Sequence, residues 1–211
     1  MKKTIAIVAL VVLVAVASVL GTLAYLTSTD TVKNTFTVGK VNITLDEAEV
    51  DMNGVAVTPA KRVKKNEYKL MPGHTYTKDP MVTVLAGSEP SYIKMTVTFS
   101  KANELDAIFA PTGADLTSIF NGYDSANWIY KDNTKDATAD TRTYEFWYKE
   151  TVGAPTADVA LDALFDSITI PGEITQAQLE TIKDMTITVT AYAIQADGFA
   201  NADAAWAKFS N

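Results

Sequence analysis

Hydrophobic and polar residues alternate with a period of two along most of the chain after residue 33. The longest such stretches are 34–50, 80–100, 125–152 and 185–197. Successive side chains of a strand point to opposite faces of a sheet, so this alternation predicts strands with one buried face. The stretch 185–197 is the most regular and the poorest in charge, which favours a central strand.

Turn residues divide these stretches into hairpins. Asn53-Gly54 is a strong signal for a two-residue hairpin turn. Val82 and Val84 are expected to pair with 92–99 across the turn-rich sequence AGSEP. A further hairpin is predicted around the polar sequence KDNTKDATADT, where one aromatic strand faces another: Trp128 and Tyr130 opposite Tyr144, Phe146 and Tyr148.

Helical spacing of apolar residues is limited to short segments. It predicts helices within 101–119, 159–165 and 172–184, and a last one near Trp206. Thr175 is the expected N-cap of the third. Many strands with few short helices predict an all-β protein, a jelly-roll-type β-sandwich with short helical insertions and an N-terminal signal helix.

The first residues have the order of a secretory signal. Lys2 and Lys3 precede an apolar run over 5–20, and Thr22 and Ala24 stand at the −3 and −1 positions of a small-residue cleavage site. We therefore expect residues 1–24 to be a signal peptide cut before Tyr25. The run is also long enough to cross a bilayer as an uncleaved anchor, which is the alternative.

Cleavage would leave a mature domain over 25–211, with a partly helical insertion at about 101–170. Removing 24 of the 211 residues leaves 187, with 16 basic against 25 acidic side chains and a formal charge of −9, compared with −7 for the whole chain. An acidic chain without a basic block disfavours nucleic acid as a partner. The chain has no cysteine, so no disulfide stabilises it outside the cell.

Residues for catalysis or metal binding are scarce. His74 is the single histidine and lies in a predicted turn, and no metal-binding motif, serine elbow or phosphate loop is present. The sequence therefore predicts no enzyme, no catalytic residue, no metal and no cofactor. A structural or binding protein is the remaining class.

Three phrases resemble the TasA and camelysin family, whose members are exported by Gram-positive bacteria. They are GTLAYLTSTDTVKNTFTVGKVNITL, LMPGHTYTKDPMVTVLAGSEPSYIKM and ITVTAYAIQADGF, which begin at Gly21, Leu70 and Ile187. The resemblance implies a jelly-roll sandwich, a signal peptidase of the SipW type, and, for matrix-forming members, fibres in which one N-terminal strand completes the next subunit's sheet. Camelysin-like members are described as surface metalloproteases, but this chain lacks a metal-ligand cluster.

The residues after the predicted cut suit strand addition. Residues 25–32 are β-prone, free of Pro and Gly, and contain one charge: Tyr25, Leu26, Thr27, Ser28, Thr29, Asp30, Thr31 and Val32. The membrane anchor would hold this strand until cleavage releases it. We therefore predict a secreted structural protein of the cell surface or biofilm matrix that polymerises with itself and contacts the cell wall or other matrix components.

Two other functions remain open at this point. The chain could be a monomeric surface-binding module, adhesin-like or carbohydrate-binding, that grips a ligand with Trp128, Tyr130, Phe146 and Tyr148. A camelysin-like surface protease is the third possibility. The first residues of the mature chain could equally be an ordinary strand of their own subunit or a frayed end.

Overall fold

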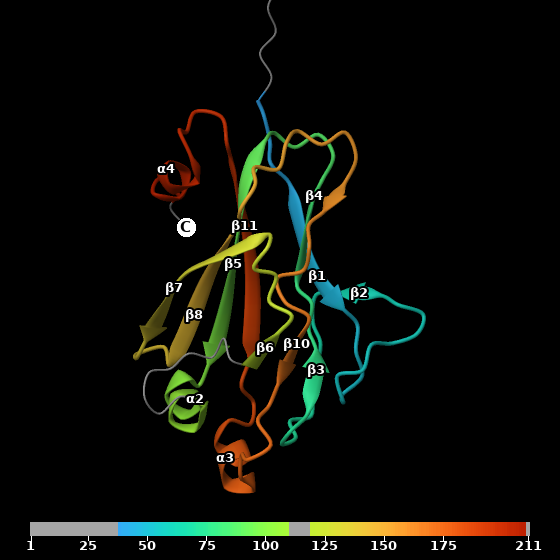
Figure 1. Ribbon diagram of the computed structural model, residues 1–211, viewed down its shortest axis with the longest axis vertical. Helices are drawn as coiled ribbons and strands as arrows, with labels where there is room; N and C mark the ends of the chain where they lie inside the picture. The colour runs from blue at the N-terminus through green and yellow to red at the C-terminus, as the bar shows by residue number, and fades with distance from the viewer. Residues whose placement is uncertain (1–37, 110–118, 210–211) are drawn as a thin grey trace, which may run out of the picture. The chain divides into compact units, whose positions relative to one another are not determined.

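The computed structural model describes residues 38–109 and 119–209, which belong to one compact unit over Val38–Asn211. The predicted signal peptide, the predicted cleavage residues and the expected donor strand lie outside the described residues. The described chain is mostly strand, arranged in antiparallel sheets with few short helices (Figure 1). The all-β prediction is therefore confirmed.

The largest sheet has four long strands in the order β11-β5-β8-β7. These are β5 (Ser91–Ser100), β7 (Trp128–Asp136), β8 (Thr141–Tyr148) and β11 (Ile187–Gln195). Side chains of β5 alternate strictly between buried and half-buried, because every second residue from Ser91 to Phe99 points into the core. This regular central strand sets the register of both neighbours.

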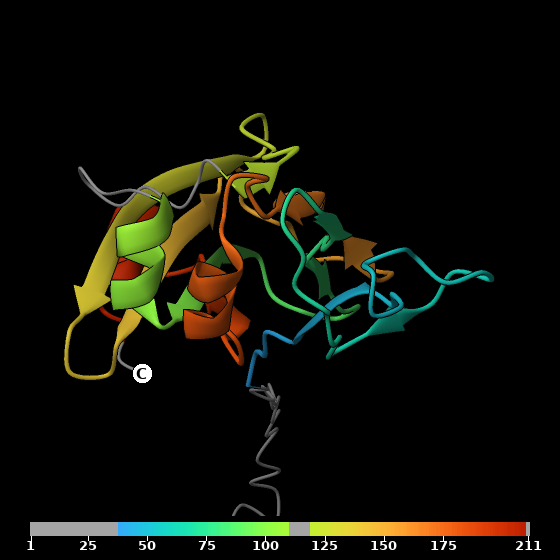
Figure 2. The same ribbon diagram turned by 90° about the horizontal axis from the view of Figure 1, so that it is seen from below.

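Shorter strands form two further sheets, in the orders β2-β1-β4-β9 and β3-β10-β6. Their bounds are β1 (Ile43–Ala48), β2 (Arg62–Val63), β3 (Thr75–Thr77), β4 (Met81–Val84), β6 (Phe120–Asn121), β9 (Val159–Ala160) and β10 (Ser167–Thr169). Figures 1 and 2 show β1 to β4, β9 and β10 on the side of the core opposite β7 and β8. The arrangement is sandwich-like, with one core between the layers.

Within the described residues, three helices lie at the ends and on the outside of the sheets: α2 (Ala102–Phe109), α3 (Gln176–Thr181) and α4 (Ala202–Trp206). Thr175 caps α3 as predicted, since its hydroxyl accepts from the Gln178 backbone N–H while its own N–H donates to the Gln178 side chain. The cation of Lys94, on the outer face of β5, lies over the rings of Tyr192, Trp206 and Phe209, which holds α4 against that face.

The predicted Asn53-Gly54 turn and the predicted aromatic hairpin are found in the structure. Asn53 and Gly54 lie in a tight turn where the Asp51 N–H donates to the Val55 carbonyl and Val50 bridges Ala56. Strands β7 and β8 pair with the expected partners facing each other, Trp128 opposite Tyr148 and Tyr130 opposite Phe146.

Strand β4 pairs differently from the prediction. Val82 lies opposite Leu45 of β1, and Val84 lies opposite Ile43 and Val159, so neither pairs with β5. Residues 85–90 carry the chain from one sheet to another instead of closing a hairpin within one sheet, and the Gly87 N–H donates to the Pro155 carbonyl on the way. Turn composition alone does not distinguish a hairpin from a crossing of this length.

Two further predictions are wrong. The stretch 185–197 contains β11, whose one neighbour among the described strands is β5. It is therefore an edge strand, and β5 and β8 are the interior strands. The apolar residues of 159–165 form no helix: Leu161 and Leu164 donate backbone N–H groups to Val82 and Pro80, which extends β9 along β4. Burial of an irregular segment gives the same apolar spacing as a short helix.

The expected insertion at about 101–170 comprises α2 and the strands β6 to β10. Two of these strands, β7 and β8, are half of the four-stranded sheet. The loop between α2 and β6 includes residues outside the described part. The region 101–170 contributes Phe120 and Phe165 to the core, and their rings stack with 4.5 Å between the centroids.

Replacing Phe165 with Ala should lower the free energy of unfolding by about 3–5 kcal/mol, because the ring is fully buried and its removal leaves a cavity. Urea denaturation followed by circular dichroism measures the change. Ile129→Ala is the matched control, since Ile129 is 43% exposed and should change stability by less than about 1 kcal/mol. Similar losses in the two variants would contradict this account of the core.

Acid should weaken the attachment of α2 to the sheet. Burial alone would raise the pKa of Asp106, but hydrogen bonds from Arg142 and Lys135 outweigh it and lower that pKa overall. The carboxylate therefore stabilises the fold above the ordinary Asp range, and this contribution is lost as pH falls through the lowered folded pKa. Asp106→Asn should cost about 1–3 kcal/mol at neutral pH, and the difference from wild type should shrink in acid. Urea titrations at several pH values test this.

Candidate functional site

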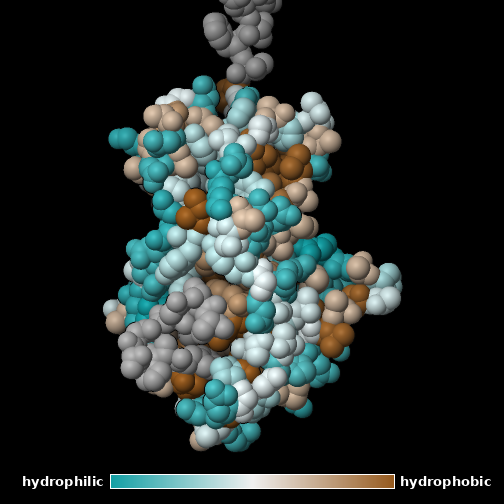
Figure 3. Space-filling model, viewed as in Figure 1, coloured by the Kyte–Doolittle hydropathy of each residue, from teal (hydrophilic) through white to brown (hydrophobic). Residues whose placement is uncertain are grey.

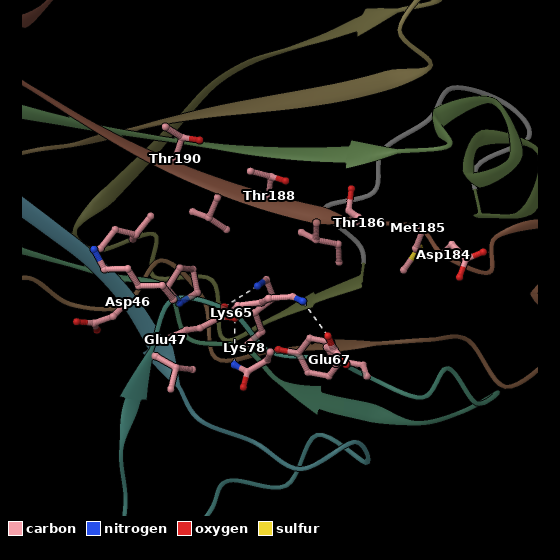
Figure 4. Close-up of a pocket in the computed structure, with 18 of the residues that line it drawn as sticks. Asp46, Glu47, Lys65, Glu67, Lys78, Asp184, Met185, Thr186, Thr188 and Thr190 are labelled. Carbon is pink, nitrogen blue, oxygen red and sulfur yellow. Dashed lines mark hydrogen bonds and ion pairs between the residues drawn. The ribbon is translucent and has the colours of Figure 1, made fainter.

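A groove of about 1030 Å³ runs between β1 of one layer and the free edge of β11 in the other. Figure 4 shows Thr188 and Thr190 on β11 and Thr186 just before it, with Asp46 and Glu47 across the groove on β1. Residues 63–68 and Lys78 form a wall, and the turn that follows α3 closes one end. The groove is thus built from two strand edges rather than from a loop cluster.

The edge of β11 presents unpaired backbone groups to this groove. The Ser100 N–H donates to the Thr186 carbonyl and the Ala196 N–H donates to the Pro90 carbonyl, so the even-numbered residues of β11 bond to β5. Hydrogen-bonded pairs alternate in an antiparallel ladder. The N–H and C=O groups of Ile187, Val189 and Ala191 therefore point away from β5, toward the groove.

The facing part of β1 also has unpaired backbone groups, over a shorter length. Its residues 42, 44 and 46 bond toward β4, as the bond from the Leu85 N–H to the Asn42 carbonyl shows. By alternation, the backbone groups of Ile43 and Leu45 point to the other side. Strand β2 pairs with β1 only at Glu47 and Ala48, so Ile43 and Leu45 remain unpaired beside the groove.

The floor of the groove is a part of the hydrophobic core that the described chain leaves partly open. Half-buried apolar side chains from both layers pack against the core here: Ile43, Leu45, Tyr68, Leu70, Met185, Ile187, Val189 and Ala191. Their side chains alternate along β1 and β11 as in any strand. A further strand laid between the two edges would cover them with every second side chain.

A buried ion pair stands in the wall of the groove. The Lys78 Nζ lies 2.5 Å from the Glu47 carboxylate, and both residues are less than a tenth exposed. Next to them, burial raises the pKa of the Tyr68 phenol, and the negative charge of Glu47 raises it further. Outside this pair, Arg62 binds Asp46 and Asp79, which joins β2 to the start of β4.

The aromatic hairpin does not form an open binding face. Trp128 and Phe146 are 1% exposed, and the Trp128 indole N–H donates to the Asp162 carbonyl inside the fold. Tyr130 is 39% exposed but its ring packs on Phe146, and Tyr148 packs edge-on against Trp128. These four residues mainly build the core, which weakens the case for a ligand-gripping hairpin.

The surface offers few other sites. Figure 3 shows small hydrophobic patches separated by hydrophilic residues on the face in view. His74 Nε2 lies 2.6 Å from the Asn53 carbonyl and its ring packs on Tyr76. Across residues 38–109 and 119–209, no three His, Asp or Glu side chains gather where they could hold a metal ion. Within the same residues, no helix has the length and apolar character needed to cross a membrane.

The sequence patterns do not predict the groove. They predict a donor strand over 25–32, but not the strand edge that would accept it. The predicted cleavage residues Thr22, Ala24 and Tyr25 and the predicted donor residues 25–32 lie outside the described part of the chain. One signal could have indicated the acceptor: the charge-free alternation of β11, which was interpreted as a central strand. Lys78, Glu47 and Asn66 carry no local motif.

No protein-family model, curated protein or solved structure matches the chain. The resemblance to the TasA and camelysin family therefore stays a prediction. A function for the chain has to be inferred from the geometry of the groove between β1 and β11.

Proposed function

We propose that the chain is a secreted structural subunit that assembles into fibres by N-terminal donor-strand addition. The observation that carries the proposal is the groove between β1 and β11, where two unpaired strand edges flank a partly open core. An extended peptide bound there would gain main-chain hydrogen bonds along the β11 edge, which is how β-augmentation provides affinity.

The proposed occupant is the segment 25–32 of a second copy of the chain. Residues 25–37 include thirteen residues, which extend to about 43 Å at about 3.3 Å each. The nine residues of β11 span about 30 Å by the same measure. The donor is thus long enough to fill the groove and leave a short connection. Leu26 and Val32 are apolar and share one side of an extended strand, as the floor requires.

The other sheet edges are protected in ways that the β11 edge is not. Strand β7 carries Lys131, Asp132, Lys135 and Asp136 and is interrupted by a bulge after Tyr130. Strands β2, β6 and β9 have two residues each, and β3 has three. Strand β11 has nine residues without a charge, proline or bulge. Natural proteins avoid such an edge unless it has a partner.

The start of the described chain favours a neighbouring subunit over the donor's own groove. Residues 40–42 are fixed beside 85–89, because the Lys40 carbonyl accepts from the Glu89 N–H and the Asn42 N–H donates to the Ser88 hydroxyl. The described chain therefore begins at the end of β1 and β4, and residues 25–37 are attached there. In the proposed fibre they continue into the next subunit and complete its sandwich, which we propose to be of the jelly-roll type.

Export follows from the same proposal. Cleavage before Tyr25 by a signal peptidase of the SipW type would free the donor strand, so polymerisation would begin only outside the membrane. The product would be a fibre of the cell surface or biofilm matrix, with other copies of the chain as its main partner. The chain would have no enzymatic activity.

Removing residues 25–32 should convert an assembling protein into a folded monomer. Chain 25–211 is expected to form large particles in sedimentation velocity and electron microscopy, whereas chain 33–211 should sediment as a monomer with an unchanged far-UV spectrum. A synthetic peptide of residues 25–37 should raise the melting temperature of chain 33–211, because it binds only the folded groove. A peptide of scrambled sequence is the control.

Assembly of the truncated chain would contradict the donor-strand proposal. A monomeric chain 25–211 at high concentration would also contradict it, and would favour the monomeric surface-binding module.

Val189→Pro should block assembly while the subunit still folds. The Val189 N–H points to the groove and bonds no strand of its own sheet, and edge strands tolerate proline at such positions. Ala160→Pro on β9 is the matched control: the Leu161 N–H binds Val82, so by alternation the Ala160 N–H also points to a free edge. Sedimentation velocity should show monomers for Val189→Pro and particles for Ala160→Pro. Equal assembly of both variants would show that the acceptor lies elsewhere.

A further inference from the structure

The Glu47 carboxylate in the groove wall accepts hydrogen bonds from two nitrogen atoms, the amine of Lys78 and the carboxamide nitrogen of Asn66. The Glu47 Oε2 accepts from the Lys78 Nζ at 2.5 Å, and the Glu47 Oε1 accepts from the Asn66 side-chain N–H at 3.1 Å. Figure 4 shows Lys78 and Glu47 side by side in the wall. An amine, a carboxamide and a carboxylate that bridges them therefore share one site, and Glu47 and Lys78 are 8% and 6% exposed.

The carboxamide of Asn66 is fixed in a way that would activate it. Its Oδ1 accepts from the Val50 backbone N–H at 3.0 Å, and its Nδ2 donates to the Ala48 carbonyl at 2.8 Å as well as to Glu47. A backbone N–H aimed at a carbonyl oxygen stabilises the negative charge that develops there when a nucleophile adds. The Nδ2 at the same time lies against a carboxyl group that can protonate it as it leaves.

From this geometry we propose that Lys78 and Asn66 join through an intramolecular amide bond, with Glu47 as the proton carrier. Glu47 first takes a proton from the Lys78 ammonium, which leaves a neutral amine and a neutral carboxylic acid. The Nζ adds to the Asn66 Cγ, the Cγ–Nδ2 bond breaks, and Glu47 passes its proton to the leaving nitrogen while accepting one from the Nζ. The products are a secondary amide, one ammonia molecule and protonated Glu47, so no oxidant or cofactor is needed.

Burial favours this reaction over the ion pair that precedes it. Two charges held away from water lose hydration, and proton transfer followed by condensation replaces them with neutral groups. A lysine amine freed of its proton in a dry site is a nucleophile. Restricted positions of the amine and the carboxamide supply the orientation that an uncatalysed amide exchange lacks.

The bond would tie the groove wall to the body of the fold. Asn66 lies in the connection between β2 and β3, and Lys78 lies between β3 and β4, so the cross-link closes a loop over 66–78. Closing a loop covalently restricts the unfolded chain, as a disulfide does. The chain has no cysteine, and this amide would provide a covalent restraint that chemical reduction does not break.

Mass spectrometry of the folded wild-type chain tests the proposal on its own, without any fibre. The intact mass should be lower than the sequence mass by one ammonia. Trypsin should yield a branched peptide in which 66–69 is joined to 70–94, with no cleavage after Lys78, because its amine is consumed. Heat denaturation should show a lower melting temperature for variants that lack the bond.

Two variants serve as controls, and circular dichroism confirms that each is folded. Lys78→Arg keeps the positive charge beside Glu47 but cannot form this bond, and Glu47→Gln keeps the hydrogen-bonding shape but cannot carry the proton. Both should show the full sequence mass and a free 66–69 peptide.

Three results would overturn the proposal. The first is a folded wild-type chain, incubated for days, with full mass and normal cleavage after Lys78. The second is an ammonia loss that persists in Lys78→Arg. The third is an ammonia loss mapped to Asn53-Gly54, where an asparagine can lose ammonia by cyclising onto its own backbone.

Discussion

The rest of the structure depends on the unpaired backbone edge of β11. A buried N–H or C=O without a partner costs about 1–3 kcal/mol, so this edge must stay open to water or find another strand. The described chain leaves it open. The cost is an incomplete core: apolar side chains such as Ile43 and Val189 remain half-buried at the groove instead of being sealed inside.

The remaining core explains how a subunit can fold before its groove is filled. A connected cluster of buried aromatic rings lies in the core away from the groove. It consists of Phe99, Phe120, Tyr144 and Phe165. The Arg142–Asp106 pair fixes α2 over the end of this cluster. Stability and assembly thus depend on different parts of the fold, which is why the proposed strand addition need not be coupled to folding of the subunit.

Sequence patterns predicted the strands, turns and caps themselves better than they predicted which strands pair with each other. The aromatic hairpin, the Asn53-Gly54 turn and the Thr175 cap follow from residues close together in the chain, so local rules were sufficient. The partners of β4 and the edge position of β11 depend on contacts between distant segments. A charge-free alternating strand is equally suited to the centre of a sheet and to an edge that a partner will cover. The sequence could not separate these two cases.

The candidate site was beyond prediction for the same reason. The wall of the groove brings together Glu47 from β1, Asn66 from the connection between β2 and β3, and Lys78 from the connection between β3 and β4. Each is an ordinary polar residue in its own sequence context. Charged residues are rarely buried unless they are paired, so a buried lysine in the wall of an apolar groove needs a specific reason. An ion pair alone contributes little net stability when its desolvation is counted. A rigid wall beside the acceptor edge does supply a reason, because a preformed groove loses less conformational entropy when a strand enters it.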